Sequence, residues 1–252
     1  MCQAFSCLVL PDTTVVWQFG VDSHEELLKL TEFKFKDDTA DPNKMTFCRV
    51  EISPKNKNYL EPDKWALGID QEKPMWWTSE HADAAEKAHK EWMKKLDKLL
   101  LKKPIIRPFR DITPPKKITK KHLDLLSAWI NAWAGMRINI WNKMGAMVGA
   151  STRNSIWNNV GISVWDRLGA NMAESVEDHI VAYTGSFFKF PSSTWKYTKK
   201  IKIKGYPFQS AVDLWMMGLV LSFDGKTWRL HGGKNGKVLW KGDERAFLKK
   251  EK

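Results

Sequence analysis

A four-residue repeat in the middle of the chain constrains the fold more than any other feature. Numbered in fours from Trp129, the first position of each repeat is a Trp, an Arg or a Gly as far as Gly169. The fourth position is almost always aliphatic or Met from Ala132 to Ile180. A position that accepts both Trp and Gly is not a tightly packed core site, because exchanging them there costs several kcal/mol. We therefore expect the first position at a surface or interface and the fourth position in the core.

The period of this repeat restricts the secondary structure it can form. A helix has about 3.6 residues per turn, so a four-residue stripe turns by about 40° around the helix with each repeat. One straight helix over 129–180 would bury no continuous face, and Gly, Asn, Ser and Val are mediocre or poor helix formers. Two structures stay open: helical segments that break or bend, and a β-solenoid with the aliphatic position stacked inside. Helix-forming segments at 120–129 and 174–183 flank the repeat and favour the helical alternative.

The N-terminal part of the chain has the pattern of a small α+β domain. Two β-rich runs around a Pro-Asp turn predict a hairpin. Ser23 and Glu26 have the spacing of a capping box, which predicts a short helix. Two later runs predict further strands. The segments are, in order, 4–10, 15–21, 22–30, 45–52 and 64–70.

The remaining segments predict helices and a short meander, so the fold class is α+β. Ser79 can cap a long helix over 79–103, and Thr119 can cap the helix that leads into the repeat. Near the C-terminus, a helix between Pro207 and Gly218 precedes an antiparallel meander. We divide the chain into an N-terminal α+β domain (1–78), a helix and proline-rich strap (79–117), the repeat (118–187) and a basic α+β tail (188–252).

The repeat resembles a degenerate array of W-D-S-V tetrapeptides. Its frame is similar to that of uncharacterised phage and prokaryotic proteins that carry such arrays, and the similarity extends over most of the chain. It rests on the segments VDSHEELLKL, RVEISP, WKYT, GYPFQSAVDLW and SFDGKTWRLHGG. This chain departs from the array by frequent Asn for Asp or Ser, and Ile or Met for Val. The resemblance implies no particular activity.

The net charge of +12, from 41 Lys and Arg against 29 Asp and Glu, favours an acidic partner. Lysines surround the start of the helix capped by Thr119, and a second basic run interleaves lysines with aromatic residues that can stack on bases. Two Arg of the repeat can extend this surface. The candidate nucleic-acid-binding residues are Lys116, Lys117, Lys120, Lys121, Arg137, Arg153, Trp195, Lys196, Tyr197, Lys199, Lys200, Lys202 and Lys204. The leading hypothesis is a non-catalytic protein that binds nucleic acid or another polyanion.

The tryptophans of the repeat support a different hypothesis. Exposed Trp side chains are frequent anchors of protein interfaces, and a stripe that turns around its helix needs other surfaces to cover it. The candidate interaction residues are Trp129, Trp133, Trp141, Trp157 and Trp165. The alternative function is therefore a repeat-based scaffold for protein interaction or self-assembly.

Catalytic and metal-binding patterns are weak. If Met1 is removed, Cys2 becomes an N-terminal thiol with its own amine as base, as in N-terminal-nucleophile amidohydrolases. The residue after it is Gln3, where glycine is usual in that class. Cys2, Cys7 and Cys48 with His24 lack the close spacing of a zinc site. We assign no catalytic residue, metal or cofactor, and an enzyme is the less favoured hypothesis.

The compartment follows from what the sequence lacks. No apolar run is long enough for a membrane-spanning helix, and the N-terminus has no basic region before its short apolar run. Three sparse cysteines do not suggest a disulfide framework. We therefore expect no membrane span and a cytoplasmic protein.

Overall fold

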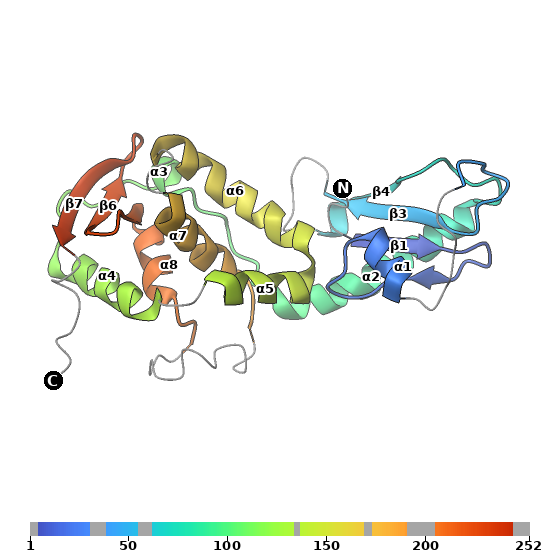
Figure 1. The fold of residues 1–252 in the computed structure, drawn as a ribbon, viewed down its shortest axis with the longest axis horizontal. Coiled ribbons are helices and arrows are strands. Elements are labelled where there is room, and N and C mark those ends of the chain that lie inside the picture. The colour runs from blue at the N-terminus through green and yellow to red at the C-terminus, as the bar shows by residue number, and fades with distance from the viewer. Residues whose placement is uncertain are drawn as a thin grey trace. The chain divides into compact units, whose positions relative to one another are not determined.

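The chain forms two compact units with an α+β fold (Figure 1). The computed structural model describes residues 5–30, 39–54, 62–133, 137–168, 173–190 and 205–243. The first unit comprises Met1–Leu100 and Met144–Ser155, and the second comprises Leu101–Lys143 and Ile156–Lys252. The fold class predicted from the sequence is confirmed, whereas the predicted four-part division stays a prediction.

The first unit contains a four-stranded antiparallel sheet with the strand order β2-β1-β3-β4. The predicted hairpin is confirmed and consists of β1 (Phe5–Val9) and β2 (Val15–Val16). Helix α1 (His24–Leu30) follows, and then β3 (Cys48–Ser53), the 3-10 helix η2 (Pro62–Lys64) and β4 (Ala66–Ile69). The long helix α2 (Ser79–Leu99) completes this part of the unit.

The two faces of this sheet differ in chemistry. In β3, alternate side chains are buried, and Val50 lies opposite Cys7 of β1. That face packs against α2, where Phe5 meets His89 and Trp92 with ring centroids 5.3 and 5.7 Å apart. On the opposite face, α1 covers β1, and β3 presents the polar side chains of Arg49, Glu51 and Ser53. This second face carries the side chains that could bind a ligand or an ion.

Helix α2 differs from its predicted limits at both ends. Its N-cap is Thr78, not Ser79, because the Nδ1 atom of His81 accepts a hydrogen bond from the Thr78 backbone N–H at 3.0 Å. Such a capping box satisfies backbone groups that the first turn leaves without partners. The helix ends at Leu99, four residues before the predicted end at 103.

The repeat is helical, and the β-solenoid alternative is wrong. Most of it forms α5 (Arg137–Val148) and α6 (Ala150–Leu168), and its last residues lie in α7 (Ala173–Gly185). The prediction for the fourth position is confirmed, since almost every one of its described side chains is buried. The buried members are Ala132, Ile140, Met144, Val148, Ile156, Val160, Val164, Leu168, Val176 and Ile180. Residues four apart form a ridge on a helix, so the fourth position supplies a packing ridge within each of these helices.

The helix breaks within the repeat at Gly149. Gly149, a first-position residue, separates α5 from α6 with φ of +88°. Its N–H donates to the Gly145 carbonyl at 3.0 Å, so the hydrogen-bond ladder of α5 reaches it. A side chain there would meet Asp22, whose Oδ2 lies 3.1 Å from the place of a Cβ. Glycine at this position is therefore required both by the backbone and by a close neighbour.

The second unit packs helices against a three-stranded antiparallel sheet. Besides parts of α5 and α6, this unit contains the helices α4 (Lys120–Trp133), α7 and α8 (Gln209–Met216). Its sheet has the strand order β5-β6-β7. The strands are β5 (Leu219–Phe223), β6 (Thr227–Gly232) and β7 (Lys237–Asp243), which confirms the predicted meander. The proline-rich strap (104–117) contains a short helix, α3 (Pro108–Asp111), because Pro108 is well suited to a first helical turn.

We expect Gly149→Ala to lower the free energy of unfolding by at least about 1–2 kcal/mol, because a Cβ at positive φ is strained and would crowd Asp22. Gly145→Ala is the matched control: it lies inside α5, and its new Cβ would meet only the flexible guanidinium of Arg153 at 3.0 Å. There we expect no loss, or a gain of up to about 1 kcal/mol from helix propensity. Urea unfolding of both variants tests this, and equal losses would contradict it.

We expect Ile156→Ala to cost about 2–5 kcal/mol, because Ile156 is a fully buried fourth-position residue. Asn158→Ala, at an exposed middle position of the same helix, should change the free energy of unfolding by less than about 0.5 kcal/mol. Chemical denaturation of the two variants measures the difference. If Asn158→Ala proved the more costly change, the assignment of the packing ridge would be wrong.

Candidate functional site

The first group of predicted lysines forms an exposed cluster at the start of α4, which we call the lysine surface: Lys116, Lys117, Lys120 and Lys121. All four side chains are exposed. Among the described ion pairs only Lys120 takes part, with Asp124 at 2.8 Å. The positive end of the helix dipole lies at the same place. This surface therefore carries several cations that the described acids do not neutralise.

The start of α4 is fixed by a local hydrogen-bond arrangement. The backbone N–H of Thr119 donates to the Nδ1 atom of His122 at 2.9 Å, and the Thr119 hydroxyl lies 3.0 Å from the same atom. This repeats the arrangement of Thr78 and His81 at the start of α2. The prediction that Thr119 begins this helix is confirmed, and the first turn that presents the lysines is thereby held in place.

Further cations lie on the turn between β6 and β7, next to the strap. A Cβ at Gly232 would lie 2.8 Å from Pro114, so the strap packs against this turn two residues before Lys116. Lys234 and Lys237 are exposed there. From α6, the Nε–H of Arg167 donates to the Lys234 carbonyl at 2.8 Å. The sequence predicted only an antiparallel meander here, because the strap that lies beside this turn is distant in the chain.

The structure does not assign the other predicted basic residues to this cluster. Arg153 belongs to the first unit, where it is half-buried and near Asp22; burial lowers the pKa of its guanidinium, and Asp22 opposes that shift. The side chain of Arg137 lies outside the described residues. So does the whole second group, whose place stays a prediction: Trp195, Lys196, Tyr197, Lys199, Lys200, Lys202 and Lys204.

The three tryptophans of the repeat whose side chains the structure describes are more enclosed than predicted. Trp129 is only 1% exposed and packs against His179 and Phe208, so the prediction that it lies at a surface is wrong. The reason is that α4 packs on α8 just where the repeat begins. Trp141 and Trp157 are half-buried and meet edge to face, with ring centroids 5.2 Å apart. The side chains of Trp133 and Trp165 lie outside the described residues.

One serine–histidine pair has the spacing of a catalytic dyad but not its exposure. The Ser222 hydroxyl lies 2.7 Å from Nε2 of His231, and Nδ1 of that histidine donates to the Gly236 carbonyl at 3.0 Å. Both side chains are buried in the sheet of the second unit. A nucleophile must reach its substrate, so this pair holds β5, β6 and the following turn together and does not perform catalysis.

His179 has a similar structural role in the same unit. Its Nε2–H donates to the Ala211 carbonyl of α8 at 2.7 Å, and its Nδ1 accepts from the Leu221 N–H of β5 at 3.2 Å. Complete burial lowers the pKa of His179 to about 4. The imidazole is thus neutral in the fold at pH 7 and joins three elements.

We expect the stability of the second unit to fall as the pH drops from about 6.5 to 4. In this interval the unfolded chain binds a proton at His179 that the folded chain does not bind, so the folded state loses about 1.4 kcal/mol per pH unit. Urea unfolding at several pH values measures the slope. In His179→Gln the unfolded chain no longer binds this extra proton, so the slope should decrease by about 1.4 kcal/mol per pH unit. A His179 ring that titrates near pH 6.5 in an NMR experiment would contradict this expectation.

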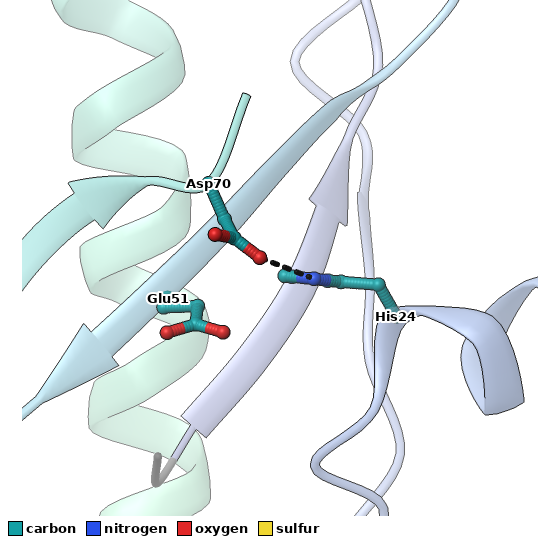
Figure 2. A group of neighbouring side chains, drawn as sticks. All are labelled: His24, Glu51 and Asp70. Atoms are coloured by element: carbon teal, nitrogen blue, oxygen red, sulfur yellow. Dashed lines mark ion pairs between the residues drawn. The ribbon is translucent and has the colours of Figure 1, made fainter. Parts of the chain in front are cut away.

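A histidine and two carboxylates come together on the polar face of the sheet in the first unit (Figure 2). His24 is the first residue of α1, Glu51 lies in the middle of β3, and Asp70 directly follows β4. One potential ligand atom from each lies within 4.8 Å of the others. The pairing of Glu51 with Gly68 places Asp70 on the same face, two residues further along β4. We call these three residues the His24 cluster.

The ring of His24 is held so that one nitrogen faces the carboxylates. Its Nε2–H donates to the Val50 carbonyl at 3.1 Å, which leaves Nδ1 directed toward Asp70, whose Oδ2 lies 3.7 Å away. Burial lowers the pKa of His24, the positive charge of Arg49 lowers it further, and the Val50 carbonyl and the two carboxylates oppose that shift. The Oε1 atom of Glu51 is buried and has no hydrogen-bond partner among the described residues. The arrangement is therefore rich in electron-pair donors, and Arg49 of β3 adds one positive charge near it.

Sequence patterns did not reveal this cluster, because its members lie on three separate elements with no characteristic spacing. The cysteines considered together with His24 lie elsewhere: Cys7 and Cys48 are buried, with free thiols, on the α2 side of the sheet. Burial raises the pKa of Cys48 to about 12 and that of Cys7 further. Neither thiol is therefore suited to be a nucleophile or a metal ligand. Cys2 lies outside the described residues.

Comparison with protein-family models, with curated proteins and with solved structures finds no match to this chain. The chemistry of the site therefore has to follow from its own geometry. None of the helices in the described ranges is both long and apolar enough to cross a membrane.

Proposed function

We propose that this protein binds a polyanion, with nucleic acid as the leading ligand, through the lysine surface at the start of α4. The observation that supports this most directly is the exposure of all four lysines around one helix N-terminus. Lysines placed in this way neutralise phosphates and release their condensed counterions. The net charge of +12 favours approach of the same ligands.

The neighbouring turn extends the proposed binding region. Lys234 and Lys237 lie next to the strap that carries Lys116, and Arg167 is fixed beside them through the Lys234 carbonyl. Cations of this kind position a protein on a phosphate backbone and do not read base sequence. We therefore propose binding with little sequence preference.

A specific feature also favours the alternative function, a scaffold for self-association. Strand β7 lies at the edge of its sheet and exposes Val238 and Leu239, at 50% and 40%. An exposed apolar edge strand can pair with another chain. The Trp residues that first suggested a scaffold give less support, since Trp129 is enclosed. Light scattering coupled to size-exclusion chromatography tests this alternative, which requires a stable oligomer.

The amidohydrolase hypothesis gains no support, because Cys2 lies outside the described residues. The cytoplasmic location is also a proposal, and two buried free cysteines are what a reducing compartment favours.

We expect the full chain to bind labelled single-stranded and duplex oligonucleotides with an affinity that falls steeply with salt. Replacing the four lysines of the lysine surface with serine should weaken binding at least 10-fold at low salt. It should also reduce the slope of log K against log salt by about 0.7–0.9 for each phosphate that is no longer neutralised. Fluorescence anisotropy at several salt concentrations measures both.

The matched control replaces Lys87, Lys90, Lys94 and Lys98, four exposed lysines of α2, with serine and removes the same charge. It should retain most of the affinity. Equal weakening by both sets would mean that net charge, and not this surface, governs binding. An unaltered chain that shows no salt-dependent binding would refute the proposed function itself.

A further inference from the structure

We propose that the His24 cluster is a binding site for one divalent transition-metal ion, with His24, Glu51 and Asp70 as its protein ligands. This site is independent of the proposed function, because the cluster lies in the first unit and the lysine surface in the second. The proposal rests on the convergence of three ligand types from α1, β3 and the end of β4 (Figure 2).

The separations of the ligand atoms are close to those that a metal requires. Two ligands bound to Zn²⁺ at about 2.1 Å in tetrahedral geometry lie about 3.4 Å apart. His24 Nδ1 and Asp70 Oδ2 lie 3.7 Å apart, and all three ligand atoms fall within 4.8 Å. The remaining adjustment is small and falls on Asp70, whose side chain is 49% exposed and can rotate. His24, at 4% exposed, stays fixed.

The orientation of His24 is that of a metal ligand. A metal-bound imidazole usually donates its other ring N–H to a carbonyl or carboxylate, which fixes the tautomer and the direction of the ring. In this chain, Nε2–H donates to the Val50 carbonyl. The proton on Nε2 leaves the Nδ1 electron pair directed at the cluster.

The Glu51 carboxylate of the cluster supports the same conclusion. Two carboxylates and the Nδ1 lone pair converge, and Oε1 of Glu51 is buried with no hydrogen bond within the described part of the chain. A buried oxygen without a partner is costly. A divalent cation would supply a partner for this oxygen.

The donor set points to the class of ion. A nitrogen ligand with two carboxylate oxygens suits Zn²⁺ or Mn²⁺ better than Mg²⁺ or Ca²⁺, which prefer oxygen alone. Zn²⁺ is the tighter binder of the first two in such sites. Three protein ligands leave a fourth position on the ion for water or for a substrate group. The site would therefore be open to a ligand from solution on the exposed side, where Asp70 lies.

Isothermal titration of the full, metal-stripped chain with Zn²⁺ tests this proposal, and the absorption of bound Co²⁺ reports the ligand set. We expect one strong site per chain. Asp70→Asn and Glu51→Gln each remove a ligand while retaining shape, so each should weaken Zn²⁺ binding at least 10-fold and alter the Co²⁺ spectrum. Glu72→Gln, an exposed carboxylate two residues after Asp70, is the matched control and should bind as the unaltered chain does.

His24→Gln would test the third ligand, although removal of its hydrogen bond to Val50 can also destabilise the unit. Circular dichroism of each variant therefore accompanies the titration, and the exposed Asp70 gives the variant least prone to unfold. An unaltered chain without a strong Zn²⁺ site would overturn the proposal. So would unchanged affinity and an unchanged Co²⁺ spectrum in folded Asp70→Asn and Glu51→Gln.

Discussion

The structure of the repeat depends on one mismatch, between a sequence period of four and a helical period of about 3.6. The aliphatic residues form a ridge that must be buried, but the ridge moves around the helix as it proceeds. The chain resolves this by ending one helix and starting another at Gly149, where the backbone takes a left-handed conformation. The ridge residues on both sides, Val148 and Ile156, remain buried although they belong to different compact units.

The same mismatch explains why one position can hold residues as different as Trp, Gly and Arg. Because the stripe turns, each first-position residue meets a different neighbour. Gly149 lies against Asp22, Gly161 against Ile180, and Trp141 against Trp157. The side chain that fits is therefore different at each site. A shared position in the repeat does not imply a shared environment, as the enclosed Trp129 shows most clearly.

Features that depend on neighbours in sequence could be predicted, whereas those that depend on distant contacts could not. The hairpin, the helix beginning at Thr119 and the turn at Asp224 follow from local hydrogen bonds, such as that from the Thr227 N–H to Asp224 at 2.8 Å. The lysine surface could also be predicted from the sequence, because its members lie within one helical turn and the segment just before it. The His24 cluster is the opposite case: the pairing of β3 with β4 and the placement of α1 bring its residues together.

The placement of residues 144–155 affects how the first unit folds during synthesis and where the chain can be truncated. This segment is separated from the first hundred residues in the sequence, yet it belongs to the same compact unit. There, Gly20 lies against the Ala146 carbonyl, and Gly149 lies against Asp22. A fragment that ends at Leu100 would lack the contacts that residues 144–155 make within this unit. During synthesis, likewise, the first unit is complete only after the ribosome has passed Ser155, so its N-terminal sheet emerges well ahead of the helical segment that closes it.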